Sequence, residues 1–243
     1  MSDFSVIIVA AGRSTRFGDG AYKKPFAPCA GKAVWLHSAE RFNDREDVGQ
    51  VVVVVSDDDR ELFDQKFGAN VMFMGLKVAR GGAERADSVA AGLQEVGDPE
   101  FVAIHDAARP CVTGKEIDKL FETVRETGAG LLATPVASTL KRGERSVVAE
   151  TVPRAGLWAA QTPQAFRRDW LTEAYAQPEA SSATDDAALV ERLGKPISIV
   201  EGSPLNIKIT SRQDLKLAEA IIHSAPKPKP KGGHPFADDD LWR

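Results

Sequence analysis

The sequence has few cysteines, no excess of basic residues and no long apolar run. Its 243 residues include two cysteines, Cys29 and Cys111, which lie far apart and form no C-x-x-C pair. This spacing indicates neither a disulfide framework nor a zinc site. The formal net charge is −4, whereas general binding to nucleic acid or to an anionic membrane requires a basic surface. No apolar stretch approaches the length of a membrane span. We therefore expect neither nucleic acid nor membrane as a partner.

The N-terminus also lacks the features of a secretory signal. Ser2 and Asp3, rather than basic residues, precede the first strand-like run. We therefore expect a cytoplasmic protein. The length is suited to one α/β domain with a sizeable core, or to two small domains at most.

Strand-like and helical patterns alternate along most of the chain. Strands are predicted at residues 5–9, 50–55, 70–74, 101–105 and 130–136, and helices at residues 33–42, 60–67, 83–96 and 115–127. This alternation predicts an α/β fold with a mostly parallel sheet and helices on both faces. Ligands of such sheets bind beyond the carboxyl ends of the strands. The residues that follow each strand are therefore the candidates for chemistry.

The alternation breaks between Pro135 and Pro153. Here the pattern predicts a β-hairpin, at about residues 135–154, with a turn at Gly143-Glu144. A hairpin is marginally stable alone, so it either reaches into a second subunit or folds back on its own domain. The chain then returns through the T-P-Q sequence at residues 162–164.

Further elements follow this return. Helices are predicted at 167–176 and 185–193, strands at 197–200 and 206–210, and a last helix at 211–223. Ser211 is the expected N-cap of that helix, and Asp214 completes a capping box. The sequence P-K-P-K-P-K-G-G-H-P has the composition of an extended, disordered tail. We expect one domain at 1–224, which includes the hairpin, and a tail at 225–243.

The first predicted strand leads into a loop rich in glycine and cations. Small residues end the strand, and the loop then carries these glycines and basic residues: Gly12, Gly18, Gly20, Arg13, Arg16, Lys23 and Lys24. Unpaired backbone N–H groups and clustered cations are what a polyphosphate requires. The glycine spacing fits neither a Walker A loop nor G-x-G-x-x-G. The alternative is a surface turn with solvated charges.

Two more segments carry candidate chemistry. Asp106 ends the strand at 101–105, where a carboxylate can hold a divalent cation on phosphate oxygens; it can equally cap a helix or pair with Arg109. The pair Gly81-Gly82 frees backbone groups beside Arg85 and Ser88, as recognition of a pyrimidine needs. The alternative there is a glycine-rich connection with an arginine at the helix start.

No Ser-His-Asp or Cys-His arrangement is evident. We interpret His105 as a core histidine at a buried strand end and Cys111 as a small buried residue. Three tryptophans are expected to be packing residues: Trp35, Trp158 and Trp170.

The chain carries, in order, A-A-G-x-x-x-R-F-G, K-K-P-F, G-G-x-x-R-x-x-S-V-x-x-G-L, H-D-A-A-R-P, T-P-Q and N-I-K-I-T. In this order and spacing these motifs resemble the 2-C-methyl-D-erythritol 4-phosphate cytidylyltransferases of the non-mevalonate isoprenoid pathway. The resemblance extends to His223 and leaves out the tail. It implies a homodimer of Rossmann-like subunits, each with a β-arm that reaches its neighbour.

The resemblance also implies roles for individual residues. Nucleotide contacts are expected from Ala10, Ala11, Gly12, Gly82, Ala83, Arg85, Ser88, Asp106 and Ala107. Arg16, Lys24 and Lys208 are the expected catalytic residues, and Asp106 the ligand of Mg²⁺. The methylerythritol phosphate is expected to bind Arg109, Lys208 and, from the other subunit's arm, Thr139 and Arg154. The chain departs from the family pattern at Ala83, where an acidic or polar residue is common, and at Lys23-Lys24, where the family often has one lysine.

The implied reaction is attack of the methylerythritol phosphate on the α-phosphorus of CTP, with release of pyrophosphate. A phosphate dianion is already a nucleophile near neutral pH, so the reaction needs no general base. One alternative is a cytidylyltransferase for another polyol phosphate, such as ribitol 5-phosphate. The other, from a different class, is a non-catalytic nucleotide-binding module.

Overall fold

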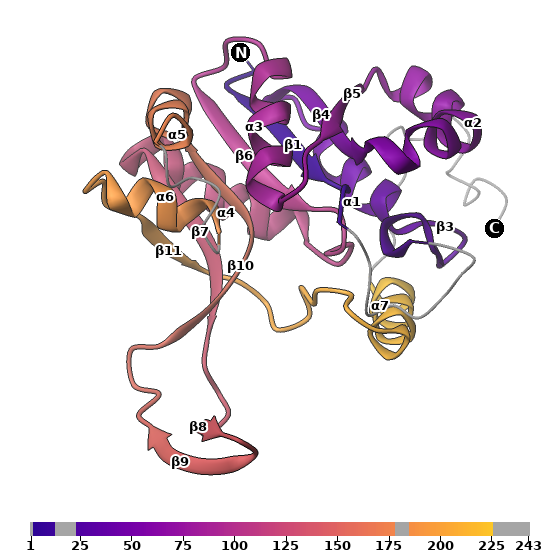
Figure 1. Ribbon diagram of the computed structural model, residues 1–243. Helices are drawn as coiled ribbons and strands as arrows, with labels where there is room; N and C mark the ends of the chain where they lie inside the picture. The colour runs from indigo at the N-terminus through magenta and orange to yellow at the C-terminus, as the bar shows by residue number, and fades with distance from the viewer. Residues whose placement is uncertain (1, 13–22, 178–184, 226–243) are drawn as a thin grey trace, which may run out of the picture.

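The computed structural model describes residues 2–12, 23–177 and 185–225. A seven-stranded sheet forms its centre, in the order β11-β7-β10-β6-β1-β4-β5 (Figure 1). The strands are β1 (Phe4–Val9), β4 (Val48–Ser56), β5 (Lys77–Gly81), β6 (Phe101–Asp106), β7 (Ala129–Pro135), β10 (Trp158–Arg167) and β11 (Ser198–Glu201). Only β10 runs antiparallel to its neighbours. The predicted mostly parallel α/β sheet is confirmed.

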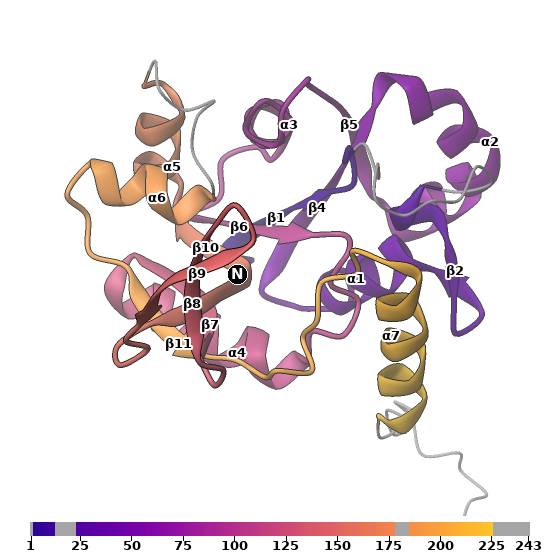
Figure 2. The ribbon, with the colours of Figure 1, turned by 60° about the horizontal axis from the view of Figure 1, so that its bottom comes forward.

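Helices cover both faces of this sheet. They are α1 (Val34–Asn43), α2 (Asp57–Met74), α3 (Arg85–Glu95), α4 (Gly114–Thr127), α5 (Arg168–Tyr175), α6 (Asp186–Arg192) and α7 (Arg212–Ser224). Figure 2 shows α3, α5 and α6 on one side of the sheet and α4 on the other. In β1, which is buried up to Ile8, Val6 and Ile8 pack with α1, α2 and α4, whereas Ile7 packs with α3, α5 and α6. Successive side chains of a strand point to opposite faces, which explains the uninterrupted apolar run of β1.

A short segment leads from the first loop into α1. It comprises the 3₁₀ turn η1 (Lys24–Phe26) and the small strands β2 (Pro28–Cys29) and β3 (Lys32–Ala33). The last helix, α7, packs against this segment in a small core that includes Ala218 of α7 and Cys29 of β2, together with Cys111 and Ile209. Ser211 and Asp214 form the predicted capping box of α7.

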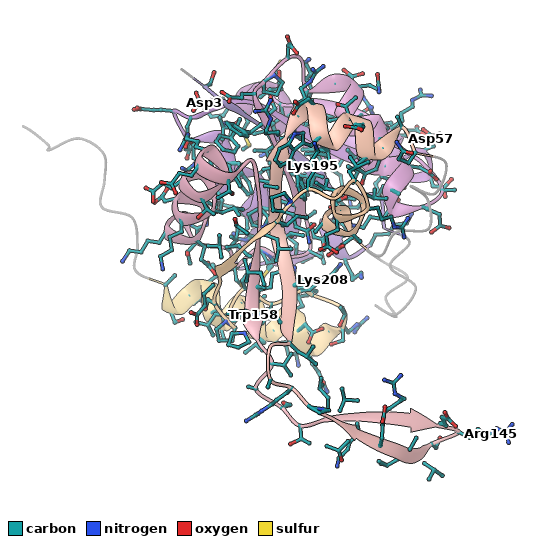
Figure 3. The ribbon with its side chains drawn as sticks, turned by 90° about the vertical axis from the view of Figure 1, so that its left-hand side faces the viewer. Asp3, Asp57, Arg145, Trp158, Lys195 and Lys208 are labelled. Atoms are coloured by element: carbon teal, nitrogen blue, oxygen red, sulfur yellow. The ribbon has the colours of Figure 1, made fainter. Side chains whose placement is uncertain are left out.

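The predicted hairpin is present as a projecting arm. It consists of β8 (Leu140–Glu144) and β9 (Val147–Val152), which pair antiparallel and extend away from the body (Figure 1). Its turn lies at Arg145 and Ser146, both with positive φ, so the predicted turn at residues 143–144 was placed slightly too early. Figure 3 places Arg145 at the tip of the arm and Trp158 close to its base.

Two predicted strands are wrong. Residues 70–74 belong to the end of α2, which stops where Gly75 adopts a left-handed conformation and its N–H bonds back to Met72 and Val71. The apolar side chains that suggested a strand include Phe73, which is 92% exposed on that helix. The strand of this region is the edge strand β5, which carries charged residues and therefore has a weak apolar pattern.

Residues 206–210 form no strand either, and run as an extended connection without a ladder. They are held by isolated hydrogen bonds to other segments, such as that from Ile209 N to Ala108 O at 2.8 Å. Conversely, T-P-Q lies inside a strand that we did not predict, β10. Pro163 is accommodated there because the register with β7 shifts between Ala160 and Gln164.

Among the described residues, none of the helices has the length and apolar character needed to traverse a bilayer.

Candidate functional site

A pocket of about 320 Å³ lies beyond the carboxyl ends of the central strands. Val9 of β1 is paired with Asp106 of β6, so the residues that follow β1 lie beside that carboxylate. The pocket is lined by Val9, Ala11, Gly12, Lys24, Pro25, Gly82, Ala83, Glu84, Arg85, Ser88, Asp106, Ala108, Lys208 and Thr210. Segments far apart in the sequence therefore converge on one cavity, at the end of the sheet where the sequence predicted it.

The small residues that follow β1 and β6 bring two backbone turns close together. Ala10 N donates to Val54 O at 2.8 Å, and Ala107 N donates to Val9 O at 3.1 Å. Ala10 and Ala107 are buried behind the pocket wall, whereas Ala11 and Gly12 line it. Ala10 and Ala107 thus shape the wall from behind, whereas Ala11 and Gly12 face the cavity.

The opposite wall is the start of α3. Glu84 and Asp87 form its capping box, and Ser88 Oγ donates to Glu84 O at 3.1 Å. A Cβ on Gly82 would come within 2.3 Å of Asp87 Cβ, so only glycine fits beside this box. Ala83 faces the cavity with them. This wall offers backbone groups and one hydroxyl, as a flat ligand would need.

Asp106 is the charge centre of the pocket. Lys208 Nζ lies 2.6 Å from its Oδ2, and Arg85 Nε lies 3.3 Å from its Oδ1. Burial by itself would raise the pKa of Asp106, but the charges of Arg85 and Lys208 outweigh it and hold this pKa far below its usual range. The carboxylate is therefore ionised at any physiological pH.

A second pocket of about 230 Å³ adjoins the first. It is lined by Arg85, Asp106, Arg109, Ala160, Gln161, Thr162, Gln164, Asp185 and Lys208. Three of these residues also line the first pocket: Arg85, Asp106 and Lys208. The ion cluster around Asp106 thus forms the boundary between two cavities, as a reaction between two bound molecules requires.

Arg109 adds a third positive charge to the second pocket, beside Arg85 and Lys208. Its Nη1 donates to Asn206 O at 2.7 Å, and its buried Nε has no hydrogen-bond partner among the described residues. Burial lowers the pKa of Arg109, and the nearby Asp106 partly opposes this. Three cationic side chains on one small pocket favour an anionic ligand there.

Comparison with known proteins identifies the family. The model for IspD, 2-C-methyl-D-erythritol 4-phosphate cytidylyltransferase, matches residues 4–224. A relative of that name from Bacillus velezensis is 44% identical over 223 residues, which cover 90% of this chain and 96% of the relative. One from Rhodopirellula baltica is 42% identical over 233 residues, covering 90% and 94%. The crystal structure of that enzyme from Thermus thermophilus superposes with a TM-score of 0.74 at 31% identity, over 89% of this chain and 98% of that one.

This chain belongs to the IspD family. The neighbouring lysines of its first loop, at which it departs from the common IspD pattern, differ in their surroundings. Lys23 Nζ pairs with Asp59 Oδ2 at 2.8 Å, whereas Lys24 lines the first pocket. Of the two lysines, Lys24 is thus the one at the pocket, and its catalytic role stays a prediction. Arg16 lies outside the described residues.

The arm residues expected to bind substrate lie away from both IspD pockets of their own chain. Thr139 precedes β8 and Arg154 follows β9, and both are exposed. Figure 3 shows the arm leading away from the part of the body that holds Lys208. Within one chain the structure therefore does not bring Thr139 and Arg154 to the site.

A polar frame behind the second pocket was missed by sequence reasoning. Asn206 is fully buried, and its Nδ2 donates to Gln161 Oε1 at 3.1 Å and to Thr162 O at 3.0 Å. Gln161 in turn donates to Ser203 O at 2.9 Å. The signal was present in T-P-Q and N-I-K-I-T, two of the motifs that carry the resemblance described above. Neither motif indicates by itself that it contacts the other.

The residues assigned to structure mostly have that role. His105 is fully buried, and burial lowers its pKa to about 4, the charge of Asp106 opposing this in part. Cys111 is buried, and burial raises its pKa to about 12. Trp35 is fully buried, as expected of a packing residue, whereas Trp158 is 40% exposed near the base of the arm and is only partly packed within one chain.

The residues present fit a metal ion that the nucleotide helps to bind. Among residues 2–12, 23–177 and 185–225, no group of three or more His, Cys, Asp or Glu side chains is placed to hold a metal. Asp106 offers one ionised carboxylate beside the larger pocket. Mg²⁺ commonly takes one or two carboxylates and completes its shell with phosphate oxygens and water.

Proposed function

We propose that this protein transfers CMP from CTP to 2-C-methyl-D-erythritol 4-phosphate, giving 4-diphosphocytidyl-2-C-methyl-D-erythritol and pyrophosphate. The observation that carries the proposal is the pair of adjoining pockets that share Asp106, Arg85 and Lys208, in a chain of the IspD family. One pocket suits a nucleotide and the other a smaller anion.

The larger pocket would bind CTP. Gly82, Ala83 and Ser88 would contact the cytosine, with Ala11 and Gly12 against the nucleotide from the other wall. Ala10 and Ala107 would shape this site from behind, and Arg85 would place a positive charge beside it. The departure at Ala83 matters little here, because a contact through its backbone amide needs no side chain.

The chemistry requires positioning and charge stabilisation rather than covalent help. A phosphate oxygen of the polyol phosphate attacks the α-phosphorus of CTP, the bond to the β-phosphate oxygen breaks, and pyrophosphate leaves. Lys24, Lys208 and, from the loop outside the described residues, Arg16 would stabilise the developing negative charge. We expect Asp106 to hold Mg²⁺, which would neutralise phosphate charge when bound.

The smaller pocket would bind the methylerythritol phosphate through Arg109 and Lys208. We further propose that Thr139 and Arg154 reach this pocket from the arm of a second subunit, in a homodimer. The arm supports this proposal because Val147 and Val148 of β9 are 69% and 60% exposed, and apolar side chains on a projecting hairpin favour burial by a partner. Residues 1–224 would form this nucleotidyltransferase domain, with 225–243 as a dispensable tail.

Pyrophosphate release with CTP tests the activity. The methylerythritol phosphate should support turnover, whereas ribitol 5-phosphate should not, at matched concentrations. Turnover with ribitol 5-phosphate alone would assign a different polyol phosphate, and tight CTP binding with neither turnover would indicate a non-catalytic module. Sedimentation analysis of the same sample tests the dimer, and a chain ending at residue 224 should retain full activity.

A further inference from the structure

A buried carboxylate holds the arginine that lies between the two pockets. Arg85 is the first residue of α3. Its Nη1 and Nη2 donate to the two carboxylate oxygens of Asp186, at 2.9 Å and 2.7 Å, while its Nε faces Asp106 at 3.3 Å. The Asp186 side chain has no exposed surface. Bidentate pairing of this kind fixes the plane of a guanidinium group as well as its position.

Tyr175, at the end of α5, fixes Asp186 from behind. Its hydroxyl donates to Asp186 Oδ1 at 2.6 Å. Burial raises the pKa of Tyr175, and the charge of Asp186 raises it further. The hydroxyl therefore stays protonated and acts as a donor, so that this carboxylate oxygen is bonded from two sides.

The start of α6, which carries Asp186, is tied to the central sheet by Gln164 of β10. Gln164 Nε2 donates to Asp185 Oδ2 at 3.1 Å, and Ala187 N donates to Gln164 Oε1 at 3.0 Å. Gln164 itself is paired with Ile104 of β6, the strand that ends in Asp106. The residues on either side of Asp186 are thus positioned relative to the same strand as the charge centre of the site.

The charges around Arg85 also balance. Arg85 faces the carboxylates of both Asp106 and Asp186, and Lys208 faces that of Asp106, so two positive side chains meet two negative ones. Without Asp186, the guanidinium group would be left with Asp106 as its remaining acidic partner among the described residues and would lose the bonds that fix its plane. Asp106 would then be drawn toward Arg85 and away from Lys208, its partner on the other carboxylate oxygen.

We propose that Asp186, supported by Tyr175, is a positioning residue that holds Arg85 at the junction of the two pockets and so orients Asp106 for nucleotidyl transfer. This inference rests on the proposed function. Asp186 touches neither pocket, so it acts through Arg85 alone. It therefore predicts that the effects of changing Asp186 and Arg85 are not independent.

A double-mutant cycle tests this dependence. Asp186→Asn keeps the shape of the side chain and removes its charge, and we expect kcat to fall on the order of 10- to 100-fold, the range seen when groups that orient a functional side chain are removed. Arg85→Gln should lower kcat at least as much. The double variant should be no slower than Arg85→Gln, because Asp186 has nothing left to position. Glu191→Gln, the same chemical change at an exposed position of α6, should retain wild-type kcat.

Thermal unfolding of each variant, followed by circular dichroism, separates positioning from misfolding. If Asp186→Asn gives no cooperative transition, Tyr175→Phe replaces it in the cycle, with an expected fall in kcat of about fivefold from loss of one hydrogen bond to a charged group. Wild-type kcat in the folded replacement, or losses that multiply in the double variant, would overturn the proposal. A wild-type protein that releases no pyrophosphate would instead overturn the proposed function.

Discussion

Gly81, the last residue of β5, lies against the turn that follows β1. A Cβ built on Gly81 would come within 2.5 Å of Ala11 Cβ and 3.0 Å of Ser88 Oγ, whereas ordinary contacts begin at 3.4 Å. In Gly81→Ala the two walls of the larger pocket must therefore separate by about 0.9 Å (3.4 − 2.5) at Ala11. The contact on that side is to a short side chain close to the backbone, which cannot rotate away.

This displacement has two expected consequences. Overpacking of this kind typically costs about 2 kcal/mol, which corresponds to a fall in Tm of about 4–8 °C for a chain of this length. A misplacement near 1 Å in a site that works by positioning lowers kcat/KM on the order of 100-fold. We expect both effects in Gly81→Ala, measured by thermal unfolding and by pyrophosphate release at varied CTP.

Gly68 provides the matched control, because it receives the same substitution in a different setting. It lies within α2, and a Cβ there would meet none of the described atoms within 4 Å. Alanine in a helix is more stable than glycine by roughly 0.5–1 kcal/mol, so Gly68→Ala should raise Tm slightly and leave kcat/KM unchanged. A Gly81→Ala variant with the Tm and kcat/KM of the wild type would refute the close approach of the two walls.

Four further predictions follow from the site, the core and the arm. Lys24→Ala should lower kcat on the order of 100-fold, as removal of a preorganised charge does. Lys23→Ala loses only the pair with Asp59 and should keep a kcat near that of the wild type. The reverse order in steady-state assays would assign the role to Lys23. Asp106→Asn should lower kcat by about the same factor or more. Turnover near the wild-type rate would refute a catalytic role for Asp106. The pKa of His105 is lowered to about 4 in the folded protein, against 6.5 when unfolded. Because the unfolded state then binds more protons, the free energy of unfolding should fall by about 3 kcal/mol as the pH drops from 6.5 to 4. Urea titrations of His105→Gln should give a shallower dependence of this free energy on pH. Val148→Asp, at an exposed position of the arm, should leave the Tm of the single subunit unchanged but shift the sedimentation coefficient to that of a monomer. A dimer of unchanged affinity would argue against the arm as the interface.

Local patterns in the sequence were sufficient for the general architecture. The uninterrupted apolar run of β1 predicted a strand covered on both faces, and its side chains do alternate between the two cores. Capping residues placed the start of α7. The alternation of strands and helices predicted the edge of the sheet at which the pocket lies, because the carboxyl ends of parallel strands meet there.

Other features depended on tertiary contacts. Residues 70–74 carry an apolar pattern that suits a strand, yet the chain extends α2 through them, and the more polar β5 takes the edge position of the sheet. The bond from Arg85 to Asp186 joins residues 101 positions apart, and neither residue alone indicates the other. The sequence by itself determined which residues can form strands, turns and charged loops, because these follow from side-chain size, polarity and local hydrogen bonding. Only the packed structure decided which charges meet, because that depends on how helices from distant parts of the chain settle on the sheet.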